Sequence, residues 1–297
     1  MKNVVITGAT GLLGSHLLPL LEDDGCRVWA ISSLPTEKDT DRLTWVQCDL
    51  AGDLAGLQAR LPERIDAVIH LAQSPRFRDF PGGAMHVFNV NVQATMHLLD
   101  VAWEAGCGHF INASSGGIYA NPESPVREDD AGLLSAGSGF YPVSKQCGEL
   151  LVNGYAGLMH AVNLRFFFIY GRGQAQSMLI PRLADSVDQG RAISLQGRDG
   201  LRINPIHASD AAVAVMRCLE MKGARTINIA GNEVVSLREI GRIIGRKLNR
   251  EPVFSCTKET ESSPEMVADT SLMHRLLGVP SVHIKEGLAD YCASLSR

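Results

Sequence analysis

Short apolar runs alternate with longer helical segments through the first half of the chain. The runs are continuously apolar, as is typical of strands buried on both faces of a parallel sheet. The helical segments between them supply the crossovers that parallel strands need. Strands are expected at Val4–Thr7, Val28–Ile31, Thr44–Cys48, Ala67–Leu71, Phe110–Ala113 and Val162–Phe168, and helices near 12–23, 53–60, 83–105 and 140–158. This alternation predicts an α/β fold with a doubly wound parallel sheet.

The pattern loosens after Tyr170 and indicates a second, smaller part. Ser236 followed by Glu239 matches a capping box at the start of a helix, and the polar stretch 251–264 is expected to be a loop. The other expected elements are helices near 178–189, 208–220 and 236–248 and strands Ile193–Leu195 and Thr226–Ala230. We predict a larger domain of residues 1–170 and 203–230 and a discontinuous α/β domain of residues 171–202 and 231–297. The smaller domain would form one wall of a cleft at the carboxyl ends of the strands.

Composition excludes several classes of protein. The 297 residues carry a net charge of −4 without a basic block, so no nucleic-acid partner is expected. No run approaches the roughly 20 apolar residues of a membrane span. The seven cysteines are scattered and form no CxxC pair, which favours buried thiols in a reducing compartment over disulfides or a zinc site. We therefore expect a soluble cytoplasmic protein without a metal.

A glycine-rich turn follows the first strand. Gly8 permits a tight turn, Gly11 lets backbone amides approach a pyrophosphate, and Gly14 lets the next helix pack on the strand. The amino end of that helix adds free N–H groups and a partial positive charge. The order of strand, glycines and helix predicts a Rossmann-type dinucleotide site in the larger domain, which leaves the smaller domain for the substrate.

The residues after the second strand leave the choice between NAD and NADP open. An acidic residue there would bind the ribose hydroxyls of NAD, but the strand ends in Ser32 and Ser33. A 2′-phosphate would need a nearby arginine, and the nearest cations are Lys38 and Arg42, farther along the chain. We expect NAD to be preferred. Asp49 would contact adenine or, as an alternative, cap a following helix.

Tyr141 and Lys145 form a candidate proton-transfer pair. They lie four residues apart, on one face of the predicted helix, and Pro142 suits its first turn. A phenol is a weak base at neutral pH unless a nearby cation stabilises its phenolate. Ser114 and Ser115 follow another buried strand, so a hydroxyl at the same sheet edge would orient a substrate alcohol or carbonyl.

These motifs together resemble the NAD-dependent epimerase/dehydratase family of extended short-chain dehydrogenase/reductases. The resemblance runs end to end. It rests on Gly8-x-x-Gly11-x-x-Gly14, Val68-Ile-His-Leu-Ala72, Ser114-Ser115 before Tyr119, Tyr141-x-x-x-Lys145, Leu164-Arg165, Tyr170-Gly171, Arg202…His207-Ala-Ser-Asp210 and Leu276-Leu-Gly278…Glu286-Gly-Leu288. Many members of this family act on nucleotide-linked sugars, and their long helices, here Met85–Ala105 and Phe140–Tyr155, form a two-fold dimer interface. In this chain those helices would equally serve as core.

The resemblance implies roles for individual residues. Ser115 would be the catalytic hydroxyl, Tyr141 the base, and Lys145 its partner and a ligand of the nicotinamide ribose. The cofactor contacts expected besides Tyr141 and Lys145 are Gly8, Thr10, Gly11, Leu12, Leu13, Gly14, Ser32, Asp49, Leu50, Leu71, Ala72, Asn91, Ser114 and Phe168. The substrate contacts expected are Ser115, Gly116 and Arg202, the last as a phosphate ligand or, as an alternative, a solvated surface residue.

Three departures from the family pattern narrow the reaction. Gly116-Gly117 replaces the Asp-Glu pair of the dehydratase branch, which argues against 4,6-dehydration. Phe166–Phe168 occupies the stretch where sugar-nucleotide enzymes usually have an asparagine, and Arg202-Ile-Asn-Pro205 replaces an Arg-Asp-Phe segment. The leading hypothesis is an NAD(P)-dependent sugar epimerase, working as a homodimer on a nucleotide sugar. The alternatives are a ketoreductase of a sugar or other small carbonyl compound and a cofactor-sensing protein without turnover.

Overall fold

The computed structural model describes residues 1–34, 38–119, 125–130, 139–258 and 263–295, which form two compact units. The first unit comprises Met1–Ala120, Ala131–Phe166 and Ala212–Ile227, and the second comprises Asn121–Asp130, Phe167–Ala211 and Asn228–Arg297. This division places 121–130, 167–170, 203–211 and 228–230 with the second unit, whereas the sequence analysis assigned them to the larger domain.

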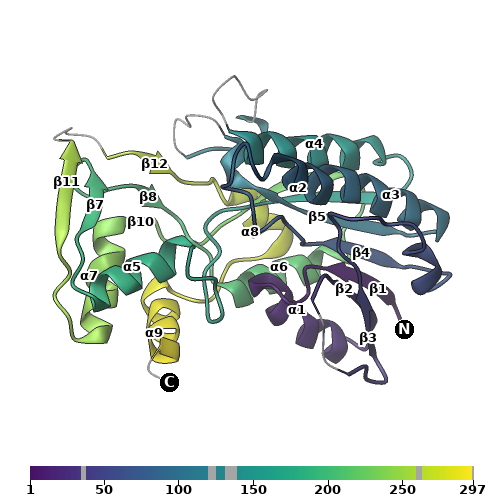
Figure 1. Ribbon diagram of the computed structural model, residues 1–297, viewed down its shortest axis with the longest axis horizontal. Coiled ribbons are helices and arrows are strands. Elements are labelled where there is room, and N and C mark those ends of the chain that lie inside the picture. Colours follow the sequence, from purple (N-terminus) through teal and green to yellow (C-terminus); the bar gives the residue numbers. More distant parts are fainter. Residues whose placement is uncertain (35–37, 120–124, 131–138, 259–262, 296–297) are drawn as a thin grey trace. The chain divides into compact units, whose positions relative to one another are not determined.

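A seven-stranded sheet organises the first unit (Figure 1). Its order is β3-β2-β1-β4-β5-β6-β9, and the pairs from β3 to β6 are parallel. The strands are β1 (Asn3–Thr7), β2 (Arg27–Ser32), β3 (Leu43–Gln47), β4 (Ala67–His70), β5 (His109–Ser115), β6 (His160–Phe166) and β9 (Arg225–Ile229). The order reverses between β1 and β4, so this is the doubly wound, Rossmann-type sheet that the sequence predicted.

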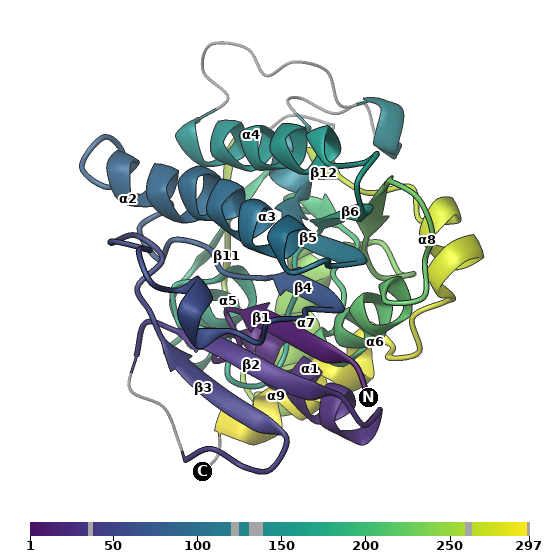
Figure 2. The same cartoon turned by 90° about the vertical axis from the view of Figure 1, so that its right-hand side faces the viewer.

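Helices cover both faces of this sheet (Figure 2). On one face lie α2 (Ala84–Phe88), α3 (Ala94–Glu104) and α4 (Phe140–Gly154), and on the other lie α1 (Leu12–Asp23) and α6 (Ala208–Cys218). Val5, Val68 and Phe110 are fully buried in the core between β-sheet and helices. The central strands therefore read as continuous apolar runs because both of their faces are covered.

Three predictions about these elements were wrong or incomplete. The helix expected near 53–60 is only a 3₁₀ turn, Gln58–Arg60, because Gly56 adopts φ = +76° and interrupts it. The helix expected at 83–105 is one helical rod, but a π-helical turn, Asn89–Gln93, separates α2 from α3. The strand expected to reach Phe168 ends at Phe166, because Phe168 has φ = +46°.

The described part of the second unit combines short strands with four α-helices and the amino end of α6. Its helices are α5 (Leu179–Asp188), α7 (Leu237–Leu248), α8 (Ser271–Leu277) and α9 (Ile284–Leu295). One small sheet contains β10 (Val235–Ser236), β8 (Arg202–Ile203) and β12 (Glu265–Met266), and another pairs β11 (Phe254–Lys258) with β7 (Ile193–Gln196). These elements pack around a buried cluster that includes Tyr170, Leu195, Ile240 and Leu288.

Two predictions in this unit had opposite outcomes. The capping box is present: the Ser236 hydroxyl accepts a hydrogen bond from the Glu239 amide at 3.2 Å, and Glu239 accepts one from the Ser236 amide at 2.8 Å. The loop expected at 251–264 is wrong for Phe254–Lys258, which is strand β11. The polar composition of this segment predicted a loop, but parallel pairing with β7 stabilises it as a strand.

Candidate active site

The turn between β1 and α1 has no room for side chains at two of its glycines. Gly8 has φ = +70°, and a Cβ atom there would lie 2.8 Å from the Ala72 amide nitrogen. A Cβ atom on Gly14 would lie 2.3 Å from the Gly8 carbonyl oxygen. Gly11 is the N-cap of α1 and makes no side-chain capping bond to the amides of the first turn. The backbone thus forms a cradle of the kind that accepts a pyrophosphate at a helix amino terminus.

The carboxyl end of β2 carries Ser32, and one arginine lies at the neighbouring strand end. The Arg60 guanidinium donates to the carbonyl of Gln47, the residue of β3 that pairs with Ser32, at 2.8 Å. Ser32 is buried, and its hydroxyl accepts a hydrogen bond from the Leu34 amide at 3.1 Å. Arg42 lies at the opposite end of β2, since its carbonyl accepts from the Val28 amide and its guanidinium donates to the Glu22 carbonyl at the end of α1. Arg42 therefore does not supply the arginine that a 2′-phosphate requires. Lys38 is exposed, and the intervening residues 35–37 lie outside the described part of the chain.

Asp49 stabilises a turn after β3. Its carboxylate accepts a hydrogen bond from the Ala51 amide at 2.9 Å, and no α-helix begins there. The alternative that Asp49 caps a helix is therefore wrong. Leu50 beside it is buried in the core of the first unit.

A buried chain of hydrogen bonds links β1 to the π-helical turn. The Thr7 hydroxyl lies 2.7 Å from His70 Nδ1, and His70 Nε2 lies 3.1 Å from the Thr95 hydroxyl, which donates to the Asn91 carbonyl at 2.8 Å. Because the Thr95 hydroxyl gives its one proton to the Asn91 carbonyl, it accepts from Nε2–H of His70, and Nδ1 then accepts from the Thr7 hydroxyl. Burial lowers the pKa of His70 to about 3, with a further contribution from the Lys145 charge. His70 is thus a neutral connector in this network.

The same chain continues to the backbone of Tyr141. Asn91 Nδ2 donates to the Ser144 hydroxyl at 3.0 Å, and that hydroxyl donates to the Tyr141 carbonyl at 2.7 Å. Among the described residues, the buried Asn91 Oδ1 and Ser114 Oγ atoms have no hydrogen-bond partner. Because a buried polar atom without a partner is costly, both atoms are suited to contact a bound group. Both residues belong to the predicted cofactor set.

Ser115 lies beside the start of α4, which carries Tyr141. A Cβ atom on Gly117 would lie 3.2 Å from Ser115 Oγ and 3.8 Å from Cγ of Pro142. Ser115 ends β5, and its hydroxyl accepts a hydrogen bond from the Gly117 amide at 3.0 Å. Burial raises the pKa of the Tyr141 phenol, and the hydrogen bond with the Ser115 side chain lowers it. Gly116 follows Ser115 and is buried in a 3₁₀ turn. A substrate oxygen near the phenol would thus find a second hydroxyl within the same site.

Lys145 lies one helical turn beyond Tyr141 and is buried. Its ammonium group donates a hydrogen bond to the Ala113 carbonyl on β5 at 2.8 Å. Burial lowers the pKa of Lys145 to about 8, while the charge of Glu149 opposes this shift. The chain therefore holds a cation beside the carboxyl end of β5 at neutral pH, at a cost in stability.

Replacing Lys145 by methionine should stabilise the fold at pH 7. A pKa lowered from 10.5 to about 8 corresponds to about 3 kcal/mol of unfavourable burial, part of which the lost hydrogen bond to Ala113 offsets. We expect a net gain of about 1–2 kcal/mol in the free energy of unfolding.

The stability of the wild type should also depend on pH. The unfolded chain retains the lysine proton between pH 8 and 10.5 and the folded chain does not, so wild-type stability should rise relative to the variant across this range. Urea unfolding at several pH values measures both effects, and a variant less stable than wild type at pH 7 would refute the account.

A buried ion pair fixes the helix that carries Tyr141 and Lys145. Arg165 on β6 donates to both carboxylate oxygens of Glu149 on α4, at 2.9 and 2.7 Å, and to the Tyr119 hydroxyl at 2.8 Å. The side chains of Arg165 and Glu149 are only 8% and 5% exposed. The pair therefore ties α4 and the segment after Ser115 to β6. The sequence analysis used Arg165 only as part of a motif and did not consider Glu149, although its spacing of four from Lys145 on one helix face was a signal.

The predicted residues Phe168 and Arg202 belong to the second unit. Phe168 sits in the irregular turn after β6, and Arg202 forms an ion pair with Glu265 on the neighbouring strand β12. A phosphate at Arg202 would compete with that carboxylate.

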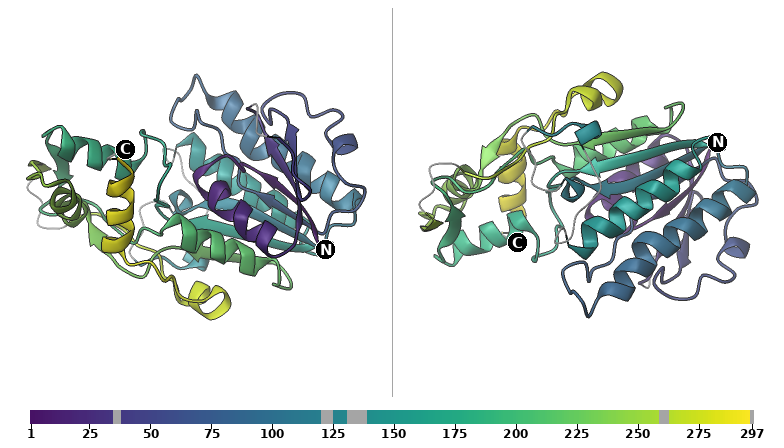
Figure 3. Two further views of the ribbon diagram at one scale, coloured as in Figure 1. Left: turned by 90° about the horizontal axis from the view of Figure 1, so that it is seen from below. Right: turned by 90° about the horizontal axis from the view of Figure 1, so that it is seen from above.

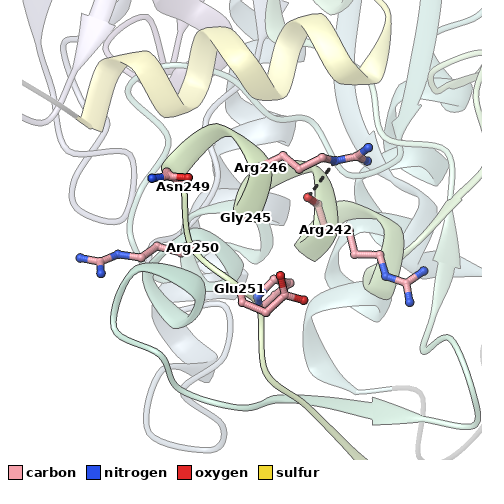
Figure 4. Close-up of a pocket in the computed structure, with 7 residues that line it drawn as sticks. Arg242, Gly245, Arg246, Asn249, Arg250 and Glu251 are labelled. Atoms are coloured by element: carbon pink, nitrogen blue, oxygen red, sulfur yellow. Dashed lines mark hydrogen bonds between the residues drawn. The ribbon is translucent and has the colours of Figure 1, made fainter.

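A pocket of about 680 Å³ lies elsewhere in the second unit, at the end of α7 (Figure 4). Arg242, Arg246 and Arg250 line it, but the guanidinium groups of Arg242 and Arg250 point in opposite directions in Figure 4. They therefore do not converge on one ligand. Within the described residues, no group of three or more histidine, cysteine, aspartate or glutamate side chains is placed to hold a metal, and no helix has the length and apolar character needed to cross a bilayer.

Comparison with known proteins agrees with this geometry. The model of the NAD dependent epimerase/dehydratase family matches residues 4–230. A dTDP-4-dehydro-6-deoxy-D-allose reductase from Streptomyces bikiniensis is 26% identical, with 97% of this chain and 94% of the relative covered. An uncharacterized UDP-glucose epimerase, YtcB, from Bacillus subtilis is 28% identical, with 99% and 98% covered. The solved structure of MoeE5 in complex with UDP-glucuronic acid and NAD has a TM-score of 0.84 at 27% identity and covers 100% of this chain and 99% of that one.

Proposed function

Because this chain belongs to the NAD-dependent epimerase/dehydratase family, we propose that it is an NAD-dependent epimerase of a nucleotide sugar, acting at carbon 4. The observation that carries the proposal is that Ser115, the start of α4 with Tyr141, and the buried ammonium group of Lys145 lie together at the carboxyl end of β5. Family membership makes it an enzyme of the extended short-chain dehydrogenase/reductase type. The similarity to a UDP-glucose epimerase and to a reductase of a 4-dehydro sugar supports chemistry at one sugar carbon.

The residues around the first glycine turn fit NAD. The backbone cradle at Gly8, Gly11 and Gly14 suits the pyrophosphate, and the unpartnered atoms of Asn91 and Ser114 are available to the rest of the cofactor. MoeE5, which shares this fold, was solved with NAD. Thr10, Leu12, Leu13, Ser32, Asp49, Leu50, Leu71, Ala72 and Phe168 remain proposed contacts.

We expect tighter binding of NAD⁺ than of NADP⁺. Arg42 is directed to the far end of α1, about 18 Å along a 12-residue helix from its glycine cradle, so it does not reach a 2′-phosphate. Isothermal titration with the four cofactor forms measures the preference. Tighter binding of NADP⁺ would show that Ser32, Ser33, Lys38 or Arg60 holds the extra phosphate.

The chain's own side chains supply the proton transfer. Tyr141, as phenolate, accepts the proton of the sugar hydroxyl, and the Ser115 hydroxyl donates a hydrogen bond to the same sugar oxygen. The Lys145 charge favours the phenolate. NAD, when bound, supplies the hydride acceptor for the sugar carbon and later the donor. After the sugar turns in the site, Tyr141 returns its proton to the oxygen.

A panel of nucleotide sugars tests the reaction. NAD-loaded protein should convert UDP-glucose, UDP-galactose or UDP-glucuronic acid into a mixture of its two carbon-4 epimers, which proton NMR resolves. Absorbance at 340 nm should stay constant during this conversion, because the reaction is redox-neutral. Failure to convert any UDP- or dTDP-linked hexose would contradict the proposal.

The reductase relative supports a second candidate. A reductase of a 4-dehydro sugar would use the same Tyr141, Ser115 and Lys145, but it would consume one reduced cofactor for each substrate. A stoichiometric fall in 340 nm absorbance with a dTDP-4-dehydro sugar would favour this function over epimerisation.

We also propose that the first unit holds the cofactor, that the second binds the sugar nucleotide, and that the protein is a homodimer. On one sheet face, α3 and α4 run side by side (Figure 3, right). Met85, Phe88 and Leu150 on this face are 68%, 42% and 60% exposed. Apolar side chains exposed on one helical layer suit a self-complementary two-fold contact.

Replacing Leu150 by glutamate should shift the dimer to monomer. The new carboxylate would face the apolar surface of the partner subunit. Sedimentation velocity at several concentrations measures the change. Leu158→Glu is the matched control, since Leu158 is 62% exposed but lies beyond the end of α4. A monomeric wild type, or equal behaviour of both variants, would refute the proposed interface.

A further inference from the structure

The hydroxyl of Tyr141 has a second partner that the sequence did not reveal. It donates a hydrogen bond to Gln73 Oε1 at 3.0 Å. Gln73 stands three residues after the end of β4, directly behind Ala72, whereas Ser115 ends the neighbouring strand β5. Side chains from the carboxyl ends of two adjacent strands thus meet at one phenolic oxygen.

The residues after Gln73 hold its backbone in place. Ser74 is fully buried, and its hydroxyl lies 2.9 Å from His86 Nδ1 and accepts from the Arg76 amide at 3.1 Å. The Phe77 ring packs on the Tyr141 ring with centroids 5.1 Å apart. The segment is therefore fixed on the start of α4, and the exposed Gln73 side chain reaches the phenol from a backbone that is held in place.

We propose that Gln73 is a positioning residue for Tyr141, whose amide holds the hydroxyl toward the substrate in both of its protonation states. The inference rests on the proposed function, in which Tyr141 alternates between phenolate and phenol. A glutamine amide carries an acceptor oxygen and a donor nitrogen, and a half-turn of its last torsion exchanges them. The oxygen accepts from the phenol, as observed, and the nitrogen donates to the phenolate.

Gln73 neither gains nor loses a proton in the proposed reaction. The substrate O–H bond breaks and the Tyr141 O–H bond forms, while Gln73 only exchanges one hydrogen bond for another. A hydrogen bond to a charged acceptor is stronger than one between neutral groups, so the loss of the amide should disfavour the phenolate. A carboxylate at this position should disfavour it further, because like charges repel.

Spectroscopy on Tyr141 tests this without a substrate. Incorporation of 3,5-difluorotyrosine at position 141 brings the phenol ionisation into the working range and gives a ¹⁹F resonance beside the hydroxyl. With NAD bound, Gln73→Met should displace this resonance and raise the pH of its titration midpoint, and Gln73→Glu should raise the midpoint more. Gln58→Met is the matched control, since Gln58 is also an exposed glutamine of the first unit, bonded to Glu104.

Kinetics on the unlabelled protein provide the second readout. Gln73→Met should lower kcat at neutral pH about tenfold with KM and NAD affinity unchanged, because it affects only the ionisation and aim of Tyr141. An unmoved resonance and midpoint in both Gln73 variants would overturn the inference, even if the nucleotide-sugar activity were established. The expected ¹⁹F changes would support it even if the substrate were of another class. Unfolding midpoints equal to wild type confirm that the variants are folded.

Discussion

Replacing Tyr141 by phenylalanine should lower kcat by about 10²–10⁴-fold, the usual contribution of a positioned acid–base group. The ring would still pack against Phe77, and the cradle at Gly8–Gly14 would be untouched, so NAD affinity should be retained. Steady-state kinetics on the epimer pair and isothermal titration with NAD⁺ measure the two quantities.

Tyr155→Phe is the control for this prediction. Tyr155 directly follows α4, and its hydroxyl donates to Asp100 at 2.5 Å, away from the site residues. It should retain normal turnover. Adding Ser115→Ala to Tyr141→Phe should cost far less than the product of the two single losses, because both groups serve one proton transfer. Near-normal turnover by Tyr141→Phe would remove this tyrosine from the mechanism.

Replacing Glu149 by alanine should destabilise the fold by about 3–5 kcal/mol, the cost of leaving a buried charge without its partner. Arg165 would lose both of its carboxylate hydrogen bonds while remaining buried between α4 and β6. Urea unfolding at pH 7 measures the loss.

Asp185→Ala provides the contrast for the buried pair. It removes the carboxylate of an exposed ion pair with Arg191, and exposed pairs contribute at most about 1 kcal/mol. If Glu149→Ala cost no more than Asp185→Ala, the buried pair would not be what fixes α4. Glu149→Ala should also lower the pKa of Lys145 further, because the Glu149 charge raises that pKa in the wild type.

The sequence predicted the parts of the fold that depend on local patterns. Buried strands such as β1 and β5 are recognisable as continuous apolar runs. Ser236 and Glu239 mark the start of a helix within four residues. The misplaced elements depend on distant partners or on single backbone angles. β11 is a strand because β7 lies beside it, and the helix near 53–60 is lost to the conformation of Gly56.

The same division applies to the active site. The spacing of Tyr141 and Lys145 and the position of Ser115 after a buried strand were sufficient to predict that they gather at one sheet edge. The hydrogen bond of Gln73 to Tyr141 joins residues 68 positions apart, and no periodicity encodes it. Its one local signal was its place directly behind Leu71 and Ala72 at the end of β4. The pairing of Arg165 with Glu149 likewise joins strand β6 to helix α4, and no local pattern encodes it.

The fate of the hydrogen on carbon 4 tests the central claim most directly. NAD-loaded protein is incubated with a UDP-hexose deuterated at carbon 4, and both epimers are followed by NMR alongside the absorbance at 340 nm. If the chain is a redox-neutral 4-epimerase, the deuterium will remain on carbon 4 of both epimers and the absorbance will not change. Formation of reduced cofactor in step with substrate loss, or exchange of the deuterium with solvent, would contradict the account.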